Sequence, residues 1–220
     1  LIFQHFLVIM KIVLASNNRG KLAELQSILA PLGVQLIAQG DLFAGEAPEP
    51  HCTFVENALA KARFAAEKTG LPAIADDAGL CLDAFGGLPG VQTAYYCTQF
   101  GYEKSDANNV RAVLEQLAQQ PSPANRQGAM VSTLVGVRHA QDPEPLIAVG
   151  RVAIEIAPQR QGEGGFGFDP VLYLPALGKT FAELPPAEKN RLSHRGQAAA
   201  AMLQLLRTNW LPAAASTPSS

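Results

Sequence analysis

The chain has 220 residues, three cysteines and a formal net charge of −2. This length allows one domain or two closely packed lobes, and the weak net charge disfavours a nucleic-acid partner held mainly through its backbone phosphates. An odd number of cysteines without CxxC or zinc-type spacing argues against a disulfide framework, so we expect a reducing cytoplasm.

The first nine residues, "LIFQHFLVI", are apolar but have no basic start and no small-residue cleavage site. They are also too short to span a bilayer, so we expect neither export nor a membrane anchor. We assign residues 1–9 to an N-terminal extension whose deletion leaves function unchanged, 10–210 to one functional domain, and 211–220 to a disordered tail.

A strand is expected from Met10, followed by a polar turn and an amphipathic helix that closes near Pro31 and Gly33. Backbone N–H groups at a helix start, together with a lysine, suit a polyphosphate. The turn matches neither GxxxxGK[ST] nor GxGxxG, so it would hold phosphate by another pattern. Its residues are Ser16, Asn17, Asn18, Arg19, Gly20 and Lys21.

A second strand is expected at 34–38, and a loop at 39–52 then leads into a long helix. Thr53 and Glu56 form a capping box at the start of this helix, and Gly70 ends it. A short buried strand at 73–75 follows and runs into two aspartates and glycine turns. Alternating strands and helices of this kind predict an α/β fold.

The second half of the chain differs in character. A helix is expected at 106–119, and the segments 128–139 and 146–156 look like long antiparallel strands. The glycine-rich loop "GEGGFGFDP" and the loop "GKTFAELPPAEKN" then lead to a last helix that begins near "SHRGQ".

Asp76 and Asp77 are adjacent carboxylates at the expected carboxyl end of a buried strand. Such a pair is costly to bury unless positive charge compensates it, and a divalent metal is the usual candidate. Adjacent strand residues point to opposite faces, so only one aspartate faces a given cleft. Glu46 and Glu49 would complete an oxygen-rich Mg²⁺ site, while the alternative is that both aspartates cap the turn before Gly79.

Three lysines and two aromatic residues are further candidates. Lys21, Lys61 and Lys189 would each be an ordinary solvent-facing charge in isolation, and Lys21 has the strongest case because it follows the phosphate-type turn. Phe166 and Phe168 suit stacking on a base, with donors from "SHRG" reading base edges. The alternative is a tight turn that places both rings in the hydrophobic core. We expect one of the two rings to be such a core residue.

Taken together, five motifs make the sequence resemble a known family. "SNNRGK", "TFVENALAKA", "IADDAGL", "GGFGFDP" and "EKNRLSHRGQA" stand in the order and at the approximate spacing of the inosine triphosphate pyrophosphatase family, over about residues 10–209. These enzymes hydrolyse dITP, ITP and XTP. The resemblance implies a two-lobed α/β fold with a central mixed sheet flanked by helices, a nucleotide cleft between the lobes, Mg²⁺ dependence and a homodimer.

The resemblance also implies roles for individual residues. The turn from Ser16 to Lys21 would hold the triphosphate, mainly through Asn18 and Lys21, and Lys61 would contact a phosphate. Asp77 would be the general base and a metal ligand, with Glu49 as a second ligand and Asp76 in support. The substrate's base pocket would comprise Phe166, Gly167, Phe168, Asp169, Lys189, His194 and Arg195.

Two consequences concern substrate selection. Arg195 can only donate hydrogen bonds, so it would favour the O6 acceptor of inosine and xanthine over the amino group of adenine. Ala78 stands where many members of the family have serine, so only a backbone contact from this position is expected.

Two other functions compete with this interpretation. A related nucleotide pyrophosphatase of the Maf type would act on modified pyrimidine or other nucleotides, and "SHRG" weighs against it. A non-catalytic nucleotide-binding module is disfavoured by the Asp76–Asp77 pair and Lys21. We therefore expect hydrolysis to a nucleoside monophosphate and pyrophosphate.

Overall fold

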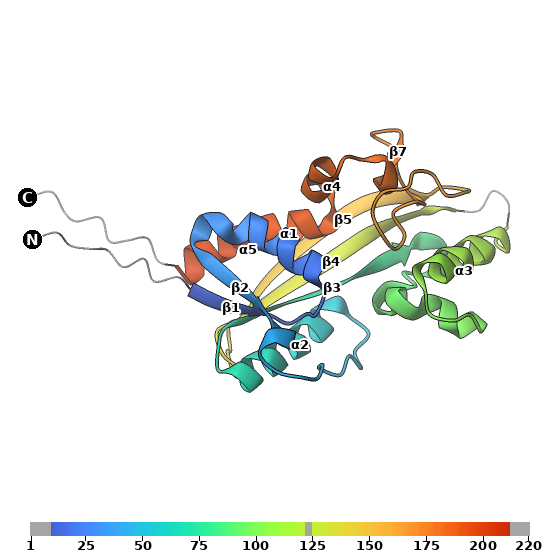
Figure 1. Ribbon diagram of the computed structural model, residues 1–220. Coiled ribbons are helices and arrows are strands. Elements are labelled where there is room, and N and C mark those ends of the chain that lie inside the picture. The colour runs from blue at the N-terminus through green and yellow to red at the C-terminus, as the bar shows by residue number, and fades with distance from the viewer. Residues whose placement is uncertain (1–9, 122–124, 212–220) are drawn as a thin grey trace, which may run out of the picture.

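The computed structural model describes residues 10–121 and 125–211 (Figure 1). The predicted extension at 1–9, and all of the predicted tail except its first residue, lie outside these ranges. No helix in the described ranges is long and apolar enough to cross a membrane.

A seven-stranded mixed sheet forms the centre of the fold, in the order β2-β1-β3-β4-β5-β6-β7. Strand β1 pairs in parallel with β2 and β3, and the remaining neighbours are antiparallel. This confirms the predicted α/β fold with a mixed sheet. The strands are β1 (Met10–Leu14), β2 (Val34–Ala38), β3 (Ala73–Leu82), β4 (Gln127–Val137), β5 (Leu146–Ile156), β6 (Leu172–Leu174) and β7 (Lys179–Thr180).

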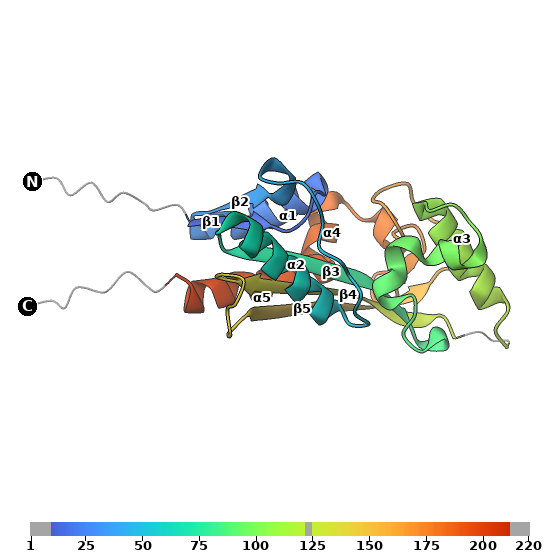
Figure 2. The same ribbon diagram turned by 90° about the horizontal axis from the view of Figure 1, so that it is seen from below.

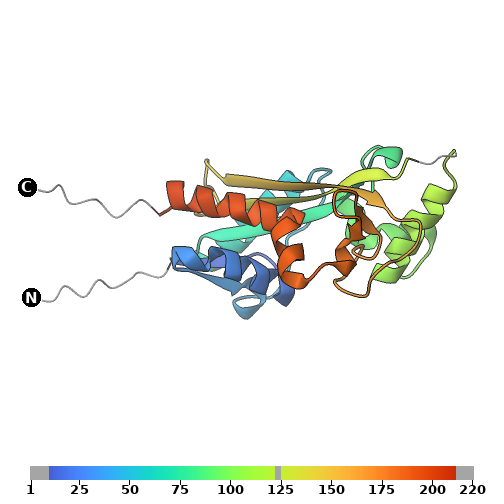
Figure 3. The same cartoon turned by 90° about the horizontal axis from the view of Figure 1, so that it is seen from above.

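Helices cover both faces of this sheet. Helices α1 and α5 lie on one side of the long strands and α2 lies on the other (Figures 1 and 3). The helices are α1 (Arg19–Leu29), α2 (Phe54–Thr69), α3 (Asp106–Ala118), α4 (Pro186–Leu192) and α5 (His194–Asn209). The described ranges also contain five 3₁₀ segments: η1 (Ala30–Leu32), η2 (Gln39–Asp41), η3 (Asp83–Phe85), η4 (Gly90–Phe100) and η5 (Phe181–Glu183).

Strand β1 shows how the sequence produces these layers. Ile12 and Leu14 pack in the cluster that contains the apolar residues of α1 and α5, whereas Val13 and Ala15 pack against the alanines of α2. Successive strand residues point to opposite faces, so an uninterrupted apolar run is what a strand covered on both faces requires.

A separate hydrophobic cluster lies at the other end of the molecule, where α3 and η4 pack against β3, β4 and β5 (Figure 2). Tyr96 and Cys97 of η4 and Val110, Val113 and Leu117 of α3 belong to it. The long strands therefore run through two packed regions, in agreement with the predicted two-lobed architecture.

Strand β3 is longer than predicted. It continues from Ala73 to Leu82 instead of ending before the aspartates, and Gly79 pairs with Val131 in the sheet instead of forming a turn. A Cβ atom at Gly79 would overlap the Gly90 carbonyl, so this glycine allows η4 to pack closely. The parallel pairing with β1 nevertheless stops at Ile74.

The predicted helix ends are largely confirmed. Asn18 caps α1, Thr53 caps α2, and Gly70 ends α2 in the left-handed conformation with φ 68°. The capping box at Thr53 is only half formed. The Thr53 hydroxyl accepts from the Glu56 N–H, but the Glu56 carboxylate accepts from the Thr53 hydroxyl and not from the Thr53 backbone N–H. The predicted loop at 178–190 instead contains β7, η5 and most of α4, which has Pro186 in its first turn.

Candidate active site

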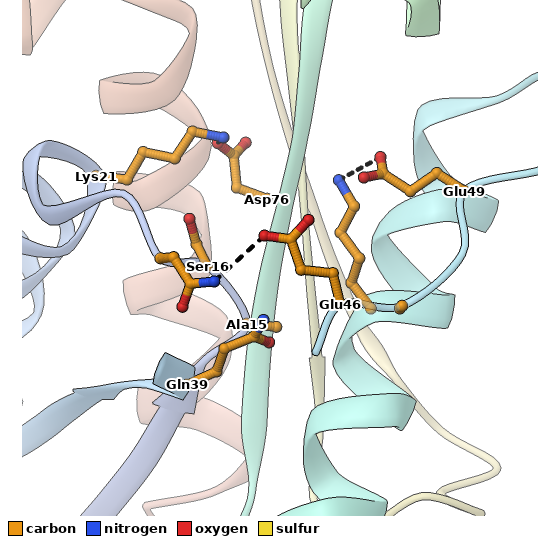
Figure 4. A pocket seen from close by; sticks show the side chains of 10 residues that line it. Ala15, Ser16, Lys21, Gln39, Glu46, Glu49 and Asp76 are labelled. Carbon is orange, nitrogen blue, oxygen red and sulfur yellow. Dashed lines mark hydrogen bonds and ion pairs between the residues drawn. The ribbon is translucent and has the colours of Figure 1, made fainter. Parts of the chain in front are cut away.

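Two adjoining pockets share Lys21. The polar pocket has a volume of about 110 Å³ and lies where β1, the loop before α2 and β3 meet (Figure 4). The aromatic pocket has a volume of about 170 Å³. The polar pocket is lined by Ala15, Ser16, Asn17, Lys21, Gln39, Glu46, Ala47, Glu49, Lys61 and Asp76. The aromatic pocket is lined by Lys21, Glu24, Ala78, Thr93, Met130, Phe166, Gly167, Phe168, Asp169, Leu172, Lys189, Asn190, Ser193, His194 and Arg195.

Asp76 is the buried anion between these pockets. Its carboxylate lies 2.9 Å from Lys21 Nζ and 3.1 Å from Arg195 Nε, and it accepts a 2.7 Å hydrogen bond from Ser132 Oγ. Burial by itself would raise the pKa of Asp76, but Lys21 and Arg195 lower it well below its usual range. Asp76 is therefore a permanent negative charge that holds the lysine shared by both pockets and the arginine of the aromatic pocket.

Asp77 faces the other side of β3. Its Oδ1 lies 2.9 Å from Lys61 Nζ, which is also 2.6 Å from the Glu49 carboxylate. Figure 4 shows Lys21 beside Asp76, with Glu49 across the pocket. Burial raises the pKa of Asp77 above its ordinary value, and the charge of Lys61 only partly opposes this. The expectation that the two aspartates face opposite ways is confirmed.

Lys61 lies on α2 between two carboxylates. Burial would lower the pKa of Lys61, but Asp77 and Glu49 raise it, so the ammonium stays charged. The structure thus brings together Lys61, Asp77 and Glu49, which come from a helix, a strand and a loop.

The turn after β1 is organised by its own side chains. Ser16 Oγ accepts from the Asn18 N–H at 3.1 Å, and Asn18 Oδ1 accepts from the Lys21 N–H at 3.1 Å. Asn17 donates to Glu46 across the polar pocket at 3.2 Å. Short polar residues are required here because their side chains satisfy the free N–H groups at the start of α1.

Three residues of the predicted phosphate turn, Asn18, Arg19 and Gly20, do not line the polar pocket. The Arg19 side chain is exposed and forms an ion pair with Asp41, so it is not among the residues that line the polar pocket. Gly20 lines a shallow neighbouring hollow together with Asn18. In this structure the pocket-facing side chains of the turn are therefore Ser16, Asn17 and Lys21.

The two phenylalanines of "GGFGFDP" have different environments. Phe168 is 6% exposed and belongs to the core, whereas Phe166 is 60% exposed at the aromatic pocket. This confirms that one ring is a core residue. Lys189 Nζ lies 4.5 Å from the Phe166 ring centroid and forms an ion pair with Asp169, which also accepts from the Phe166 N–H at 2.7 Å. Gly167 donates to Asp106 at 2.9 Å.

His194 and Arg195 open α5, whose first turn is capped by Ser193. Burial, reinforced by the charge of Arg195, lowers the pKa of His194 to about 3, so the imidazole is neutral near pH 7. Its Nδ1 atom is buried and has no hydrogen-bond partner among the described residues. A neutral histidine with a free nitrogen on the pocket wall can accept or donate a hydrogen bond to a ligand.

Arg195 is 7% exposed and lies between two carboxylates. Its Nε bonds to Asp76 and its Nη1 lies 3.3 Å from Glu24. Burial would lower the pKa of Arg195, but these carboxylates raise it, so the guanidinium is fixed and charged. Glu24 was missed from the sequence, where the only signal is its position one helical turn after Lys21.

The predicted metal ligands are compatible with Mg²⁺. Asp77 Oδ2 is buried without a hydrogen-bond partner in the described ranges, and Glu46 and Glu49 present further carboxylates at the polar pocket. Carboxylate oxygens are the ligands that Mg²⁺ prefers. Within the described ranges, however, no three Asp, Glu, His or Cys side chains are already gathered at metal-binding distance.

A family model described as the Ham1 family matches residues 12–205. The chain belongs to the Ham1 family. This confirms the resemblance inferred from the five motifs. A Ham1 relative in Delftia acidovorans, named dITP/XTP pyrophosphatase, is 72% identical over 202 residues, which cover 92% of this chain and 100% of the relative. A relative of the same name in Paracidovorax citrulli is 70% identical over 201 residues, which cover 91% and 100%.

Two solved structures share the fold. A HAM1 protein from Coxiella burnetii is 42% identical with a TM-score of 0.83, and the match covers 90% of this chain and 98% of that one. A nucleoside-triphosphatase / dITP/XTP pyrophosphatase from Mycobacterium abscessus is 40% identical with a TM-score of 0.71, covering 88% and 99%.

Proposed function

We propose that this Ham1 protein is a Mg²⁺-dependent pyrophosphatase that hydrolyses dITP, ITP and XTP to the monophosphate and pyrophosphate. The observation that carries the proposal is the meeting of the two pockets at Lys21. One pocket combines carboxylates with ammonium groups, and the other combines an exposed aromatic ring with fixed donors. The names of the two bacterial relatives described above support the same substrate class.

The polar pocket suits the triphosphate. Lys21 and Lys61 would neutralise charge on the leaving pyrophosphate, and Ser16 and Asn17 add polar contacts at the same wall. Asp77 and Glu49, with Glu46 nearby, would hold Mg²⁺, which supplies further neutralisation of phosphate charge when bound.

Asp77 is the candidate general base. Its raised pKa makes it a stronger proton acceptor than an ordinary aspartate, while its ionised form is held by Lys61. Its Oδ2 is buried and has no hydrogen-bond partner among the described residues, so it could take a proton from a water molecule that attacks the α-phosphorus once the site opens to admit that water. Asp76 does not suit this role, because its low pKa and its two cations make it a poor base.

The aromatic pocket suits a 6-oxo purine. Arg195 lines this pocket, and its Nε and Nη1 are engaged by Asp76 and Glu24, so among the described residues only Nη2 has no hydrogen-bond acceptor and would serve as the donor to a ligand. An O6 acceptor satisfies this donor, whereas the amino group of adenine does not. A buried group left unpaired costs about 1–3 kcal/mol, or about tenfold to more than a hundredfold in selectivity. Phe166 would add stacking with any purine.

The deciding experiment incubates the purified protein with Mg²⁺ and ITP, dITP, XTP, ATP or GTP in H₂¹⁸O. We expect pyrophosphate and the monophosphate as products, with ¹⁸O in the monophosphate because water attacks the α-phosphorus. Asp77→Asn should lower the rate by about 10²–10⁴-fold. Orthophosphate as the first product, or label in pyrophosphate, would contradict the mechanism.

Selectivity is tested by the ratio of kcat/KM for ITP and ATP. Arg195→Lys is preferable to alanine because it keeps the positive charge beside Asp76 while losing the planar set of donors. We expect the ITP preference to shrink mainly through slower ITP turnover. An unchanged ratio would mean that another group reads position 6.

The same assay separates the two competing functions. A Maf-type enzyme would prefer modified pyrimidine or other nucleotides, and a binding module would show no turnover. The homodimer implied by the resemblance and the cytoplasmic location inferred from the cysteines belong to the proposal as well, and light scattering of the purified protein would test the dimer.

A further inference from the structure

Asn57 is a buried polar residue outside the predicted site. It lies in the first turn of α2 and is 1% exposed. Its carboxamide forms two hydrogen bonds with the backbone of His51: Oδ1 accepts from the His51 N–H, and Nδ2 donates to the His51 carbonyl, both at 3.1 Å. This pair of bonds, which we call the Asn57 clamp, fastens the loop before α2 to the helix.

The Asn57 clamp connects two components of the candidate site. On the loop side, Glu49 lies two residues before His51. On the helix side, Lys61 lies four residues after Asn57 and therefore on the same face of α2. Lys61 Nζ then contacts both Glu49, at 2.6 Å, and Asp77, at 2.9 Å.

The loop needs such a connection. Residues 44–51 form no helix or strand, and the Glu49 side chain is half exposed. Upstream contacts hold the loop near its start, through Gln39 to the Gly45 carbonyl and Asn17 to Glu46, both at 3.2 Å. The Asn57 clamp is the fixed point on the other side of Glu49, and it restricts the positions that this carboxylate can occupy.

We propose that Asn57 is a positioning residue that holds Glu49 across from Asp77 for a divalent cation. The inference rests on the proposed function for the identity of the metal site, but the Asn57 clamp itself is a contact within this chain. Residues that orient metal ligands typically contribute about 10–100-fold to metal affinity. Asn57 acts through the loop backbone, and its side chain also lies beside Asp77, whose pKa it lowers.

The test uses Asn57→Leu, which has a similar shape and adds no charge, with Asn57→Ser as a second variant if the first folds poorly. His51→Ala is the matched control, because it removes the exposed side chain but keeps the backbone N–H and carbonyl of the clamp. Mn²⁺ binding without nucleotide is measured by electron paramagnetic resonance. The Mg²⁺ concentration for half-maximal ITP hydrolysis is measured in parallel.

We expect about 10–100-fold weaker Mn²⁺ binding in the Asn57 variants, a matching rise in the Mg²⁺ requirement, and recovery of most of kcat at saturating Mg²⁺. His51→Ala should match the parent. Parental Mn²⁺ affinity in a folded Asn57 variant would overturn the inference, as would a loss confined to kcat. If the parent failed to hydrolyse ITP, the proposed function would fall, while the Mn²⁺ titration would still decide the role of Asn57.

Discussion

Asp76 and Asp77 are identical side chains on neighbouring positions of β3, and their surroundings give them opposite proton affinities. Asp76 contacts Lys21, Arg195 and Ser132, which lower its pKa. Among the described residues, Asp77 has only Lys61 as a close cation, so burial dominates and raises its pKa. The first residue is therefore suited to holding charge and the second to accepting a proton.

This difference predicts different stabilities for two matched variants. Asp76→Asn leaves Lys21 and Arg195 without their shared buried counter-charge, and we expect a loss of about 3–5 kcal/mol in the free energy of unfolding. Asp77→Asn removes a charge that burial opposes, and Lys61 keeps Glu49, so we expect a change below about 1 kcal/mol. Urea unfolding measures both, and equal losses would contradict the assignment.

His194 predicts a pH dependence of stability. Its pKa falls from an ordinary value of 6.5 to about 3 on folding. Between these values the unfolded chain binds the extra proton, so this residue makes stability fall as the pH falls below about 6.5, by up to about 1.4 kcal/mol per pH unit. His194→Gln should flatten the stability profile between pH 6.5 and 4. A variant whose profile stays parallel to the parent's would rule out this contribution.

At the scale of the elements, the first turn of α5 is placed by a glycine on β5. A Cβ atom at Gly150 would overlap the His194 carbonyl and crowd the Ala198 nitrogen. The helix that carries His194 and Arg195 can therefore lie close to the strand only because this position has no side chain.

Gly150→Ala should accordingly move the start of α5. We expect about 1–3 kcal/mol lower stability, since overpacking has this cost, together with a smaller preference for ITP over ATP. Gly136→Ala is the control, because a Cβ atom there meets the Trp210 ring at 3.3 Å, which is a side chain near the far end of the same helix. Equal loss of selectivity in both variants would show that Gly150 has no special role.

At the scale of the whole molecule, the candidate site joins segments that are distant in sequence. The turn after β1, the loop before α2, strand β3 and the start of α5 all contribute to the two pockets. A nucleotide that contacts all of them would connect these segments, and it would bind only the folded chain.

We therefore predict strong stabilisation by a non-hydrolysable ITP analogue together with Mg²⁺. At a hundredfold excess over the dissociation constant, the free energy of unfolding should rise by about 2.7 kcal/mol. Calorimetry with and without EDTA measures this gain, and the matching ATP analogue is the control. A gain that EDTA does not reduce would contradict the role proposed for the metal.

The sequence by itself determined the local elements and the residue types of the site. Apolar periodicity located β1, β2, α1 and α2, and the caps at Thr53 and Gly70 set the limits of α2. The five motifs also sufficed to identify the family, because several short patterns in order are far more specific than one. Periodicity, helix caps and short motifs each involve residues that are close in sequence, so they can be recognised without the tertiary structure.

Only the tertiary structure decided which groups meet. Nothing near Asp76 in the sequence predicts that Arg195 would pair with it, since the two residues are 119 positions apart. The contact of Glu24 with Arg195 and the clamp from Asn57 to the His51 backbone were likewise missed. The length of β3 was also misjudged, because Gly79 resembles a turn residue until η4 is seen packed against it. Charge pairing and close packing depend on distances through space, which sequence spacing does not contain.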